Sequence, residues 1–164
     1  AEFGANVTFS PETVALETAG GIAKALPILG DQPFLVVNGD LFTDFDFARA
    51  FQWRDRVQTG ALDGVCTLVP NPAHNLAGDF ALDACELVRN PDDAAGLSNL
   101  TYAGIAVFSP ALFASIPAES AAPLAPLLRA AAGRSRLAGF QFGGEWSDVG
   151  SPERLNELNT LSTD

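Results

Sequence analysis

Hydrophobic and polar positions along the chain change their spacing several times, between the period of a helix and that of a strand. Residues 34–37 form a continuous apolar run, which predicts a central strand covered on both faces. Residues 19–26, which follow Glu17 and Thr18 and stop before Gly30, predict a short helix opened by Thr or Gly. A helix, a turn and a buried strand in this order make one α/β unit.

The alternation continues to the end of the chain and predicts a mixed α/β order throughout. Residues 90–98 contain Pro91 and Gly96 beside two aspartates, which predicts a surface loop. We expect residues 1–164 to fold as a single domain. Further strands are predicted at 64–69, 79–83, 102–108 and 137–142, and further helices at 45–54, 111–113, 123–132 and from Ser151-Pro152 onward.

The composition is that of a globular domain, and its charge excludes one class of partner. Of the 164 residues, 48% are hydrophobic and 18% are charged, which is enough apolar material for a real core. The formal net charge is −11, and Lys24 is the single lysine beside eight arginines. A nucleic-acid partner needs a basic patch against its phosphates, so none is expected. A ligand that carries phosphate would need a metal ion here.

Cysteine usage and hydropathy predict a cytoplasmic setting. Cys66 and Cys85 lack the spacing of a zinc site, and we expect both to be buried free thiols rather than a disulfide or redox pair. No apolar stretch reaches the roughly 20 residues that a membrane span requires, and no basic-then-apolar leader precedes the first segment. No membrane partner is therefore expected.

Two aspartates in turns at opposite ends of the chain are the strongest candidates for chemistry. Asp40 follows the apolar run 34–37 and the pair Asn38-Gly39, and Asp148 precedes Gly150 and a well-marked helix start. Open α/β sheets bind ligands beside the carboxyl ends of their strands, and Mg²⁺ commonly takes one or two carboxylates. The two carboxylates together therefore predict a Mg²⁺ site. Taken alone, Asp40 suits a ligand site and a turn cap equally, and Asp148 would be a cap.

Asp44 and Asp46 lie just downstream and suit a helix start, where the macrodipole favours negative charge. The Asp-x-Asp spacing also keeps open a sugar-nucleotide-dependent glycosyltransferase, which uses such a pair on one turn. His74, the single histidine, reads as a solvated loop residue.

Four short blocks in sequence order carry a family resemblance. The blocks are Leu16-Glu17-Thr18-Ala19-Gly20-Gly21-Ile22, Leu35-Val36-Val37-Asn38-Gly39-Asp40, Thr101-Tyr102-Ala103-Gly104-Ile105 and Trp146-Ser147-Asp148-Val149-Gly150-Ser151-Pro152-Glu153-Arg154-Leu155. Together they resemble consecutive motifs of the sugar-1-phosphate nucleotidyltransferases. They are most similar to the branch that acts on N-acetylmuramate α-1-phosphate, and mannose-1-phosphate guanylyltransferases share a related first block.

The resemblance implies a three-layer, Rossmann-like mixed sheet of the glycosyltransferase-A type and a nucleotidyl transfer from UTP to a sugar 1-phosphate, releasing pyrophosphate. It also implies a place in cell-wall recycling. By similarity, Asp40 and Asp148 hold the Mg²⁺ ion and are the catalytic pair. Implied nucleotide contacts are Glu17, Thr18, Gly20, Gly21 and Asn38, and implied sugar contacts are Gly78, Tyr102 and Gly104. Gly20 and Gly21 also suit a simple helix entry.

One departure from the family concerns its N-terminal part. Family members begin with a strand and a Gly-rich loop bearing Arg, followed by a Pro-Lys block, and nothing in this sequence matches either. We therefore expect a chain that forms the C-terminal two thirds of the domain, with a weak grip on the triphosphate and a possible separate N-terminal chain as partner. The alternative from another class is a non-catalytic sugar-nucleotide binding or regulatory module.

Overall fold

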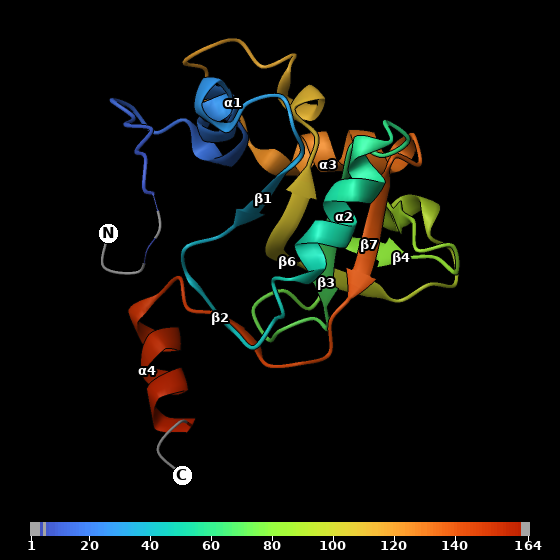
Figure 1. Ribbon diagram of the computed structural model, residues 1–164. Helices are drawn as coiled ribbons and strands as arrows, with labels where there is room; N and C mark the ends of the chain where they lie inside the picture. The colour runs from blue at the N-terminus through green and yellow to red at the C-terminus, as the bar shows by residue number, and fades with distance from the viewer. Residues whose placement is uncertain (1–3, 5, 162–164) are drawn as a thin grey trace.

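The computed structural model describes residues 4 and 6–161, and its elements alternate between helix and strand. Figure 1 shows them arranged around one central sheet. In chain order they are α1 (Glu17–Leu29), β1 (Phe34–Val37), β2 (Leu41–Thr43), α2 (Arg49–Gln58), β3 (Gly64–Val69), β4 (Phe80–Leu82), β5 (Val88–Arg89), β6 (Asn99–Phe108), α3 (Leu124–Gly133), β7 (Leu137–Gln141), β8 (Trp146–Asp148) and α4 (Pro152–Leu161), with single 3₁₀ turns at Pro91–Asp93 and Pro110–Phe113.

The sheet is mixed, as predicted, and β6 is its centre. β6 pairs antiparallel with β1, β3 and β4, whereas β3 and β7 run parallel to each other. The strand order is β5-β4-β6-β3-β7, with β1 paired to β6. A separate two-stranded sheet joins β2 to β8. No helix in the described part of the chain is long and apolar enough to cross a membrane.

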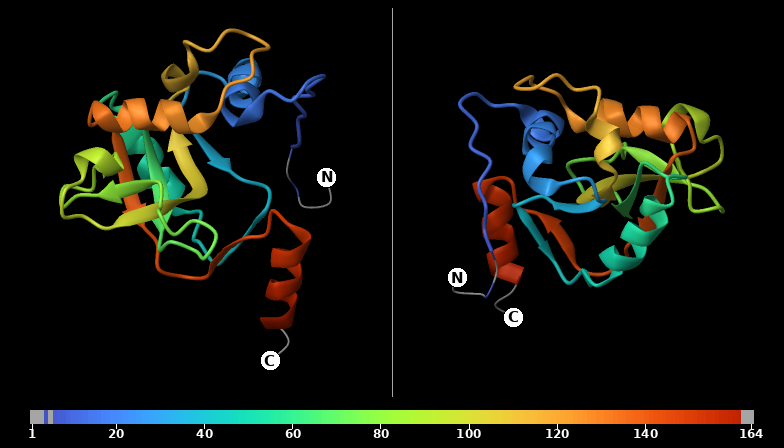
Figure 2. Two further views of the ribbon diagram at one scale, coloured as in Figure 1. Left: turned by 180° about the vertical axis from the view of Figure 1, so that it is seen from behind. Right: turned by 45° about the horizontal axis from the view of Figure 1, so that its top comes forward.

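Two hydrophobic cores lie on opposite faces of the sheet and make it the middle of three layers. Successive strand residues point to opposite faces, so neighbours in β3 and β6 belong to different cores. Val65 and Val107 pack with Trp53 of α2, whereas Cys66 and Ala106 pack against α1 and α3. Figures 1 and 2 show α2 apart from α1 and α3, and α4 projecting away from the sheet.

Several local predictions need correction. The helix predicted at 45–54 begins at Arg49 and ends at Gln58. Phe45 precedes the helix and is only 4% exposed, because its ring packs in the hydrophobic core that contains Trp53 of α2. The strand predicted to be covered on both faces is covered on one, since Leu35 and Val37 of β1 are 39% and 41% exposed. Cys66 is buried as expected, but Cys85 is an exposed free thiol.

A buried ion-pair cluster ties the start of β3 to the loop before β7. Asp63 is 7% exposed and accepts hydrogen bonds from Arg136 Nε at 2.9 Å and Arg134 Nη2 at 3.2 Å. Burial alone would raise the pKa of Asp63, but the hydrogen bonds from Arg136 and Arg134 outweigh it and hold that pKa below its ordinary value of 3.8. The unfolded state therefore takes up the proton first as pH falls.

We expect Asp63→Asn to lower the free energy of unfolding by about 2 kcal/mol at neutral pH, because both arginines lose a charged partner but stay partly solvated. The stabilisation from Asp63 is complete above its ordinary pKa and is lost as pH falls below that value. Urea unfolding at neutral and acid pH measures this, and the variant should lose less stability on acidification than the parent. Asp55→Asn, which breaks an exposed pair with Arg54, is the control and should be near neutral. An equal loss in both variants would contradict the prediction.

Candidate functional site

The two predicted aspartates meet because the short strands that carry them pair. β2 follows Asp40 directly and runs antiparallel to β8, with Leu41 opposite Asp148. The backbone N–H of Val149 also donates to the carbonyl oxygen of Asp40 at 2.9 Å. Residues more than a hundred positions apart in sequence are thus held side by side by a backbone ladder.

The carboxylates of Asp40 and Asp148 approach each other over Gly150. A Cβ atom placed on Gly150 would lie 2.8 Å from Asp40 Oδ2 and 3.0 Å from Asp148 Oδ1, so both oxygens border the space that the glycine leaves open. Asp148 Oδ1 also accepts the N–H of Gly150 at 2.9 Å. Among the described residues, no group of three or more His, Cys, Asp or Glu side chains gathers as a metal site. Two convergent carboxylates fit Mg²⁺, which completes its octahedron with water and phosphate oxygens.

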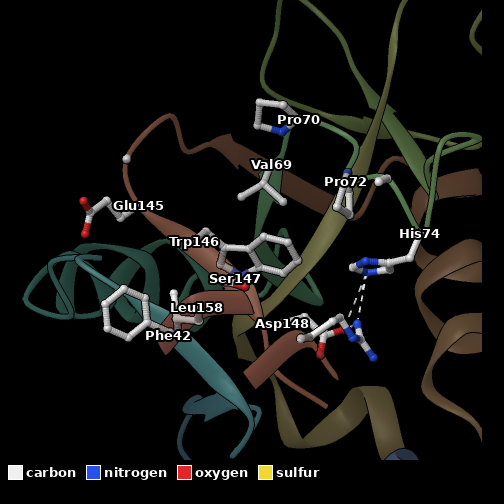
Figure 3. A pocket seen from close by; sticks show the side chains of 13 residues that line it. Phe42, Val69, Pro70, Pro72, His74, Glu145, Trp146, Ser147, Asp148 and Leu158 are labelled. Carbon is white, nitrogen blue, oxygen red and sulfur yellow. Dashed lines mark hydrogen bonds and ion pairs between the residues drawn. The ribbon is translucent and has the colours of Figure 1, made fainter. Parts of the chain in front are cut away.

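The second carboxylate oxygen of Asp148 faces basic side chains. Asp148 Oδ2 lies 2.9 Å from Arg154 Nη1 and 3.7 Å from His74 Nε2. Arg154 Nη1 and His74 Nε2 are 3.3 Å apart. Figure 3 shows His74 directed toward Asp148, with dashed lines marking these contacts. Arg154 comes from the first turn of α4, and His74 from the loop after β3.

Two adjoining cavities share His74, Trp146 and Asp148 in their walls. The smaller has a volume of about 310 Å³ and is bordered by Asn38, which follows β1, and by the middle of β6, including Gly104. The larger has a volume of about 1000 Å³ and extends toward α4, with apolar walls that include Phe42 and Leu158. Asp148 therefore belongs to the walls of both cavities, and Figure 3 shows it in the wall of the larger one.

Asn38, Tyr102 and Gly104 line the smaller cavity together. Gly104 has φ +75°, a conformation that side chains rarely adopt, and a Cβ there would lie 2.7 Å from Asn38 Nδ2. The N–H of Asn38 donates to the carbonyl oxygen of Gly104 at 2.9 Å. The close approach of these residues fixes the end of β1, from which Asp40 follows.

A family model for nucleotidyl transferases matches residues 1–164. The chain belongs to the nucleotidyl transferase family. The family resemblance found in the sequence is thereby confirmed. The chain is 45% identical, over 98% of its length, to the N-acetylmuramate alpha-1-phosphate uridylyltransferase of Neisseria meningitidis, of which it spans 68%. It is 30% identical, over 93% of its length, to a mannose-1-phosphate guanylyltransferase catalytic subunit beta of Drosophila pseudoobscura, of which it spans 41%.

Solved structures bear out the fold of this nucleotidyltransferase-family chain. A Bacillus anthracis protein assigned as a glucose-1-phosphate thymidylyltransferase superposes with a TM-score of 0.77 at 16% identity, over 99% of this chain and 68% of that one. A UDP-glucose pyrophosphorylase in complex with UDP-glucose superposes with a TM-score of 0.65 at 19% identity, over 92% and 63%. At these identities the likeness concerns the fold alone.

Asp40 and the remaining predicted site residues lie outside the walls of both cavities. Gly78 has φ +67°, and a Cβ there would lie 2.8 Å from Asn71 Oδ1, so local packing already requires glycine. Gly20 packs against the backbone, where a Cβ would meet the carbonyl oxygen of Ser120. Glu17, Thr18 and Gly21 share α1 with Gly20, and neither cavity includes them. Gly20 lies inside α1, which begins at Glu17, so close packing against Ser120 rather than helix entry accounts for it without a ligand.

Sequence reasoning missed His74, Arg154 and Trp146 as neighbours of Asp148. The Trp146 indole N–H donates to the carbonyl oxygen of Ala103 at 2.9 Å and so anchors β8 to the central strand β6. His74 is an exposed loop residue as predicted, yet it also contacts Arg154. The signal for Arg154 lay in the block that already contained Asp148, six residues after it, in the first turn of α4.

Tyr102 contributes to the smaller cavity while its phenol lies in the core. In the described part of the chain its hydroxyl oxygen is buried with no hydrogen-bond partner, and burial raises the pKa of Tyr102 well above its ordinary value. Its backbone N–H donates to Asp79 Oδ2 at 2.9 Å. The side chain thus supports the β6 strand, which forms the cavity wall.

We expect Tyr102→Phe to raise the free energy of unfolding by about 1 kcal/mol, because it removes a buried polar group without a partner. Urea unfolding measures this. Thr101→Val is the contrasting variant, since the Thr101 hydroxyl forms hydrogen bonds with Asn71 and Asn75. We expect it to lower the free energy of unfolding by about 1 kcal/mol. If Tyr102→Phe is destabilising by a similar amount, the phenol has a partner and the prediction is wrong.

Proposed function

We propose that this protein is a Mg²⁺-dependent nucleotidyltransferase that transfers a uridylyl group from UTP to N-acetylmuramate 1-phosphate, releasing pyrophosphate. The observation that carries the proposal is the 45% identity, over nearly the whole chain, to the Neisseria meningitidis uridylyltransferase. The paired carboxylates at Gly150, of which Asp148 lines both cavities, support the proposal. A cytoplasmic role in cell-wall recycling is part of the proposal.

In the proposed reaction, an oxygen of the sugar 1-phosphate forms a bond to the α-phosphorus of UTP. The bond from that phosphorus to the bridging oxygen breaks, and pyrophosphate leaves with the electron pair. The attacking phosphate is already ionised, so the site needs no general base. Catalysis of this kind rests on positioning and on neutralising phosphate charge.

Each part of the site has a role in this proposal. Asp40 and Asp148 would hold the Mg²⁺ ion, whose charge would offset that of the phosphates when it is bound. Asn38, Tyr102 and Gly104 would orient the sugar nucleotide from the wall of the smaller cavity. The assignment of Gly78 to the sugar rests on the family resemblance alone, since its side is packed against Asn71. Glu17, Thr18, Gly20 and Gly21 would face the base, and a separate N-terminal chain would complete the triphosphate grip.

A second candidate is a guanylyltransferase acting on mannose 1-phosphate. It is favoured by the 30% identity to the Drosophila pseudoobscura protein over 93% of this chain. It would use the same aspartates but a different base and sugar. A non-catalytic sugar-nucleotide binding module remains the alternative from another class.

Calorimetric binding of sugar nucleotides tests the proposal. The 164-residue chain is titrated with UDP-N-acetylmuramate and GDP-mannose, each with Mg²⁺ and with a chelator. We expect UDP-N-acetylmuramate to bind at least tenfold more tightly, and only with Mg²⁺ present. Tighter binding of GDP-mannose would replace this function with the second candidate, and binding of neither would reject both. Pyrophosphate release in an assay with UTP, N-acetylmuramate 1-phosphate and Mg²⁺ then separates an enzyme from a binding module.

A further inference from the structure

Arg154 and His74 stand out as basic side chains at a site built around carboxylates. They are the Arg, Lys or His residues that line the two cavities, and Arg154 borders the larger one while His74 borders both. The rest of the described chain uses its ion-paired cations elsewhere, on Asp55, Asp63, Asp83, Glu86 and Glu119. The protein has a net charge of −11 and few cationic side chains, so a guanidinium at this site is one of few groups that could bind an anion.

The two oxygens of Asp148 face different neighbours. Oδ1 accepts the Gly150 N–H and borders the space shared with Asp40, whereas Oδ2 contacts Arg154 and His74. Both side-chain contacts of the guanidinium, to Asp148 and to His74, use Nη1. A guanidinium carries five N–H donors in a planar fork, so it can hold a carboxylate and still present donors to a second anion.

An anion that enters from the larger cavity meets Arg154 beside Asp148. The Arg154 and Asp148 side chains are each 30% exposed, so the pair is open to a ligand rather than sealed in the core. Trp146 and Leu158 give the same cavity apolar surface beside the ion pair, which strengthens an electrostatic contact formed there. Arg154 is held on α4, whose first turn is capped by Ser151 Oγ accepting the Arg154 N–H at 3.3 Å.

Resting on the proposed function, we infer that Arg154, with His74, binds an anionic oxygen of the sugar 1-phosphate substrate and so selects for that charge. The oxygen has two possible sources in the same ligand, the 1-phosphate and an acidic substituent on the sugar ring. Arg154 then binds the sugar phosphate directly, in addition to its ion pair with Asp148.

Calorimetric titration of sugar 1-phosphates in the presence of Mg²⁺ tests the inference. The parent chain, Arg154→Gln and Arg154→Lys are titrated with N-acetylmuramate 1-phosphate and N-acetylglucosamine 1-phosphate, which differ by one lactyl carboxylate. We expect Arg154→Gln to weaken binding of N-acetylmuramate 1-phosphate by about 10- to 100-fold, because a charge-assisted contact of about 1.5–3 kcal/mol is lost. Arg154→Lys should recover part of that affinity, since it keeps the charge without the fork.

Each outcome decides the inference. Equal weakening for both sugars assigns the 1-phosphate, and weakening for the muramate compound alone assigns the carboxylate. Unchanged affinity in Arg154→Gln overturns the inference, provided the parent binds. If the parent binds neither compound, the proposed function fails instead. Arg54→Gln, in an exposed pair with Asp55, is the matched control and should bind like the parent. Thermal unfolding verifies that each variant is folded.

Discussion

Asp148→Asn and Asp40→Asn should each remove metal-dependent sugar-nucleotide binding. An amide keeps the size of the side chain and its acceptor oxygen but removes the charge that Mg²⁺ or Mn²⁺ requires. With two carboxylates gathered at Gly150, the loss of either one leaves a single charged ligand. We expect the affinity for Mn²⁺, measured by titration with UDP-N-acetylmuramate present, to fall at least tenfold, a change that even indirect partners of a metal can produce.

The control for these two variants is Asp46→Asn, at a residue close to Asp40 in the chain. Asp46 is exposed, and its Oδ1 accepts the Ala48 N–H at 3.0 Å ahead of α2, so Asp46→Asn can keep that bond. It should bind Mn²⁺ like the parent. Loss of Mn²⁺ in Asp46→Asn but not in Asp40→Asn would favour the Asp-x-Asp site of a glycosyltransferase. With a chelator present, Asp40→Asn should be at least as stable as the parent, because it removes one of two neighbouring like charges.

The elements that the sequence predicts correctly are those whose secondary structure is determined by their own residues. β3 was predicted at 64–69 and is found at Gly64–Val69, because the run is rich in β-forming residues and each of them is buried. The helix at 123–132 is found at Leu124–Gly133 for the same local reason, an apolar face at helical spacing. The mixed α/β class followed from these elements.

β2 and β8 were not predicted because the residues of neither segment determine a strand by themselves. Each spans three residues, and each exists because the other lies beside it in the fold. The expectation that Asp40 and Asp148 act together came from their positions in turns beside predicted strands and from the family resemblance, whereas the pairing of β2 with β8 was not foreseen. Likewise, nothing near His74 in sequence indicates that a helix beginning at Pro152 brings Arg154 to within 3.3 Å of it.

Glycine is the residue type whose role sequence alone resolves least. Gly20 was assigned to base binding by resemblance, yet its environment already requires glycine, because a Cβ would overlap the carbonyl oxygen of Ser120. Gly39, beside Asp40, has open space around it. The same residue type thus marks a packing constraint in one block and an accessible backbone in another, and only the three-dimensional neighbours distinguish them.

Gly104→Ala should destabilise the protein and disturb the site together. At φ +75° a side chain is strained, and its Cβ would lie 2.7 Å from Asn38 Nδ2 and 3.1 Å from Asn38 Cβ. We expect a loss of about 2–3 kcal/mol in the free energy of unfolding, from backbone strain and from displacement of Asn38. Because Asn38 ends β1 two residues before Asp40, Mn²⁺ and sugar-nucleotide binding should weaken as well.

Gly60→Ala separates the two causes. Gly60 has φ +79°, close to that of Gly104, but a Cβ there meets nothing within 4 Å. We therefore expect Gly60→Ala to lower the free energy of unfolding by about 1 kcal/mol, from backbone strain alone, and to leave ligand binding unchanged. Urea unfolding and Mn²⁺ titration of both variants give the comparison. Equal destabilisation and equal binding in the two would mean that contact with Asn38 contributes nothing. A larger loss confined to Gly104→Ala would mean that the fit of glycine against Asn38 holds the Asp40 turn in place.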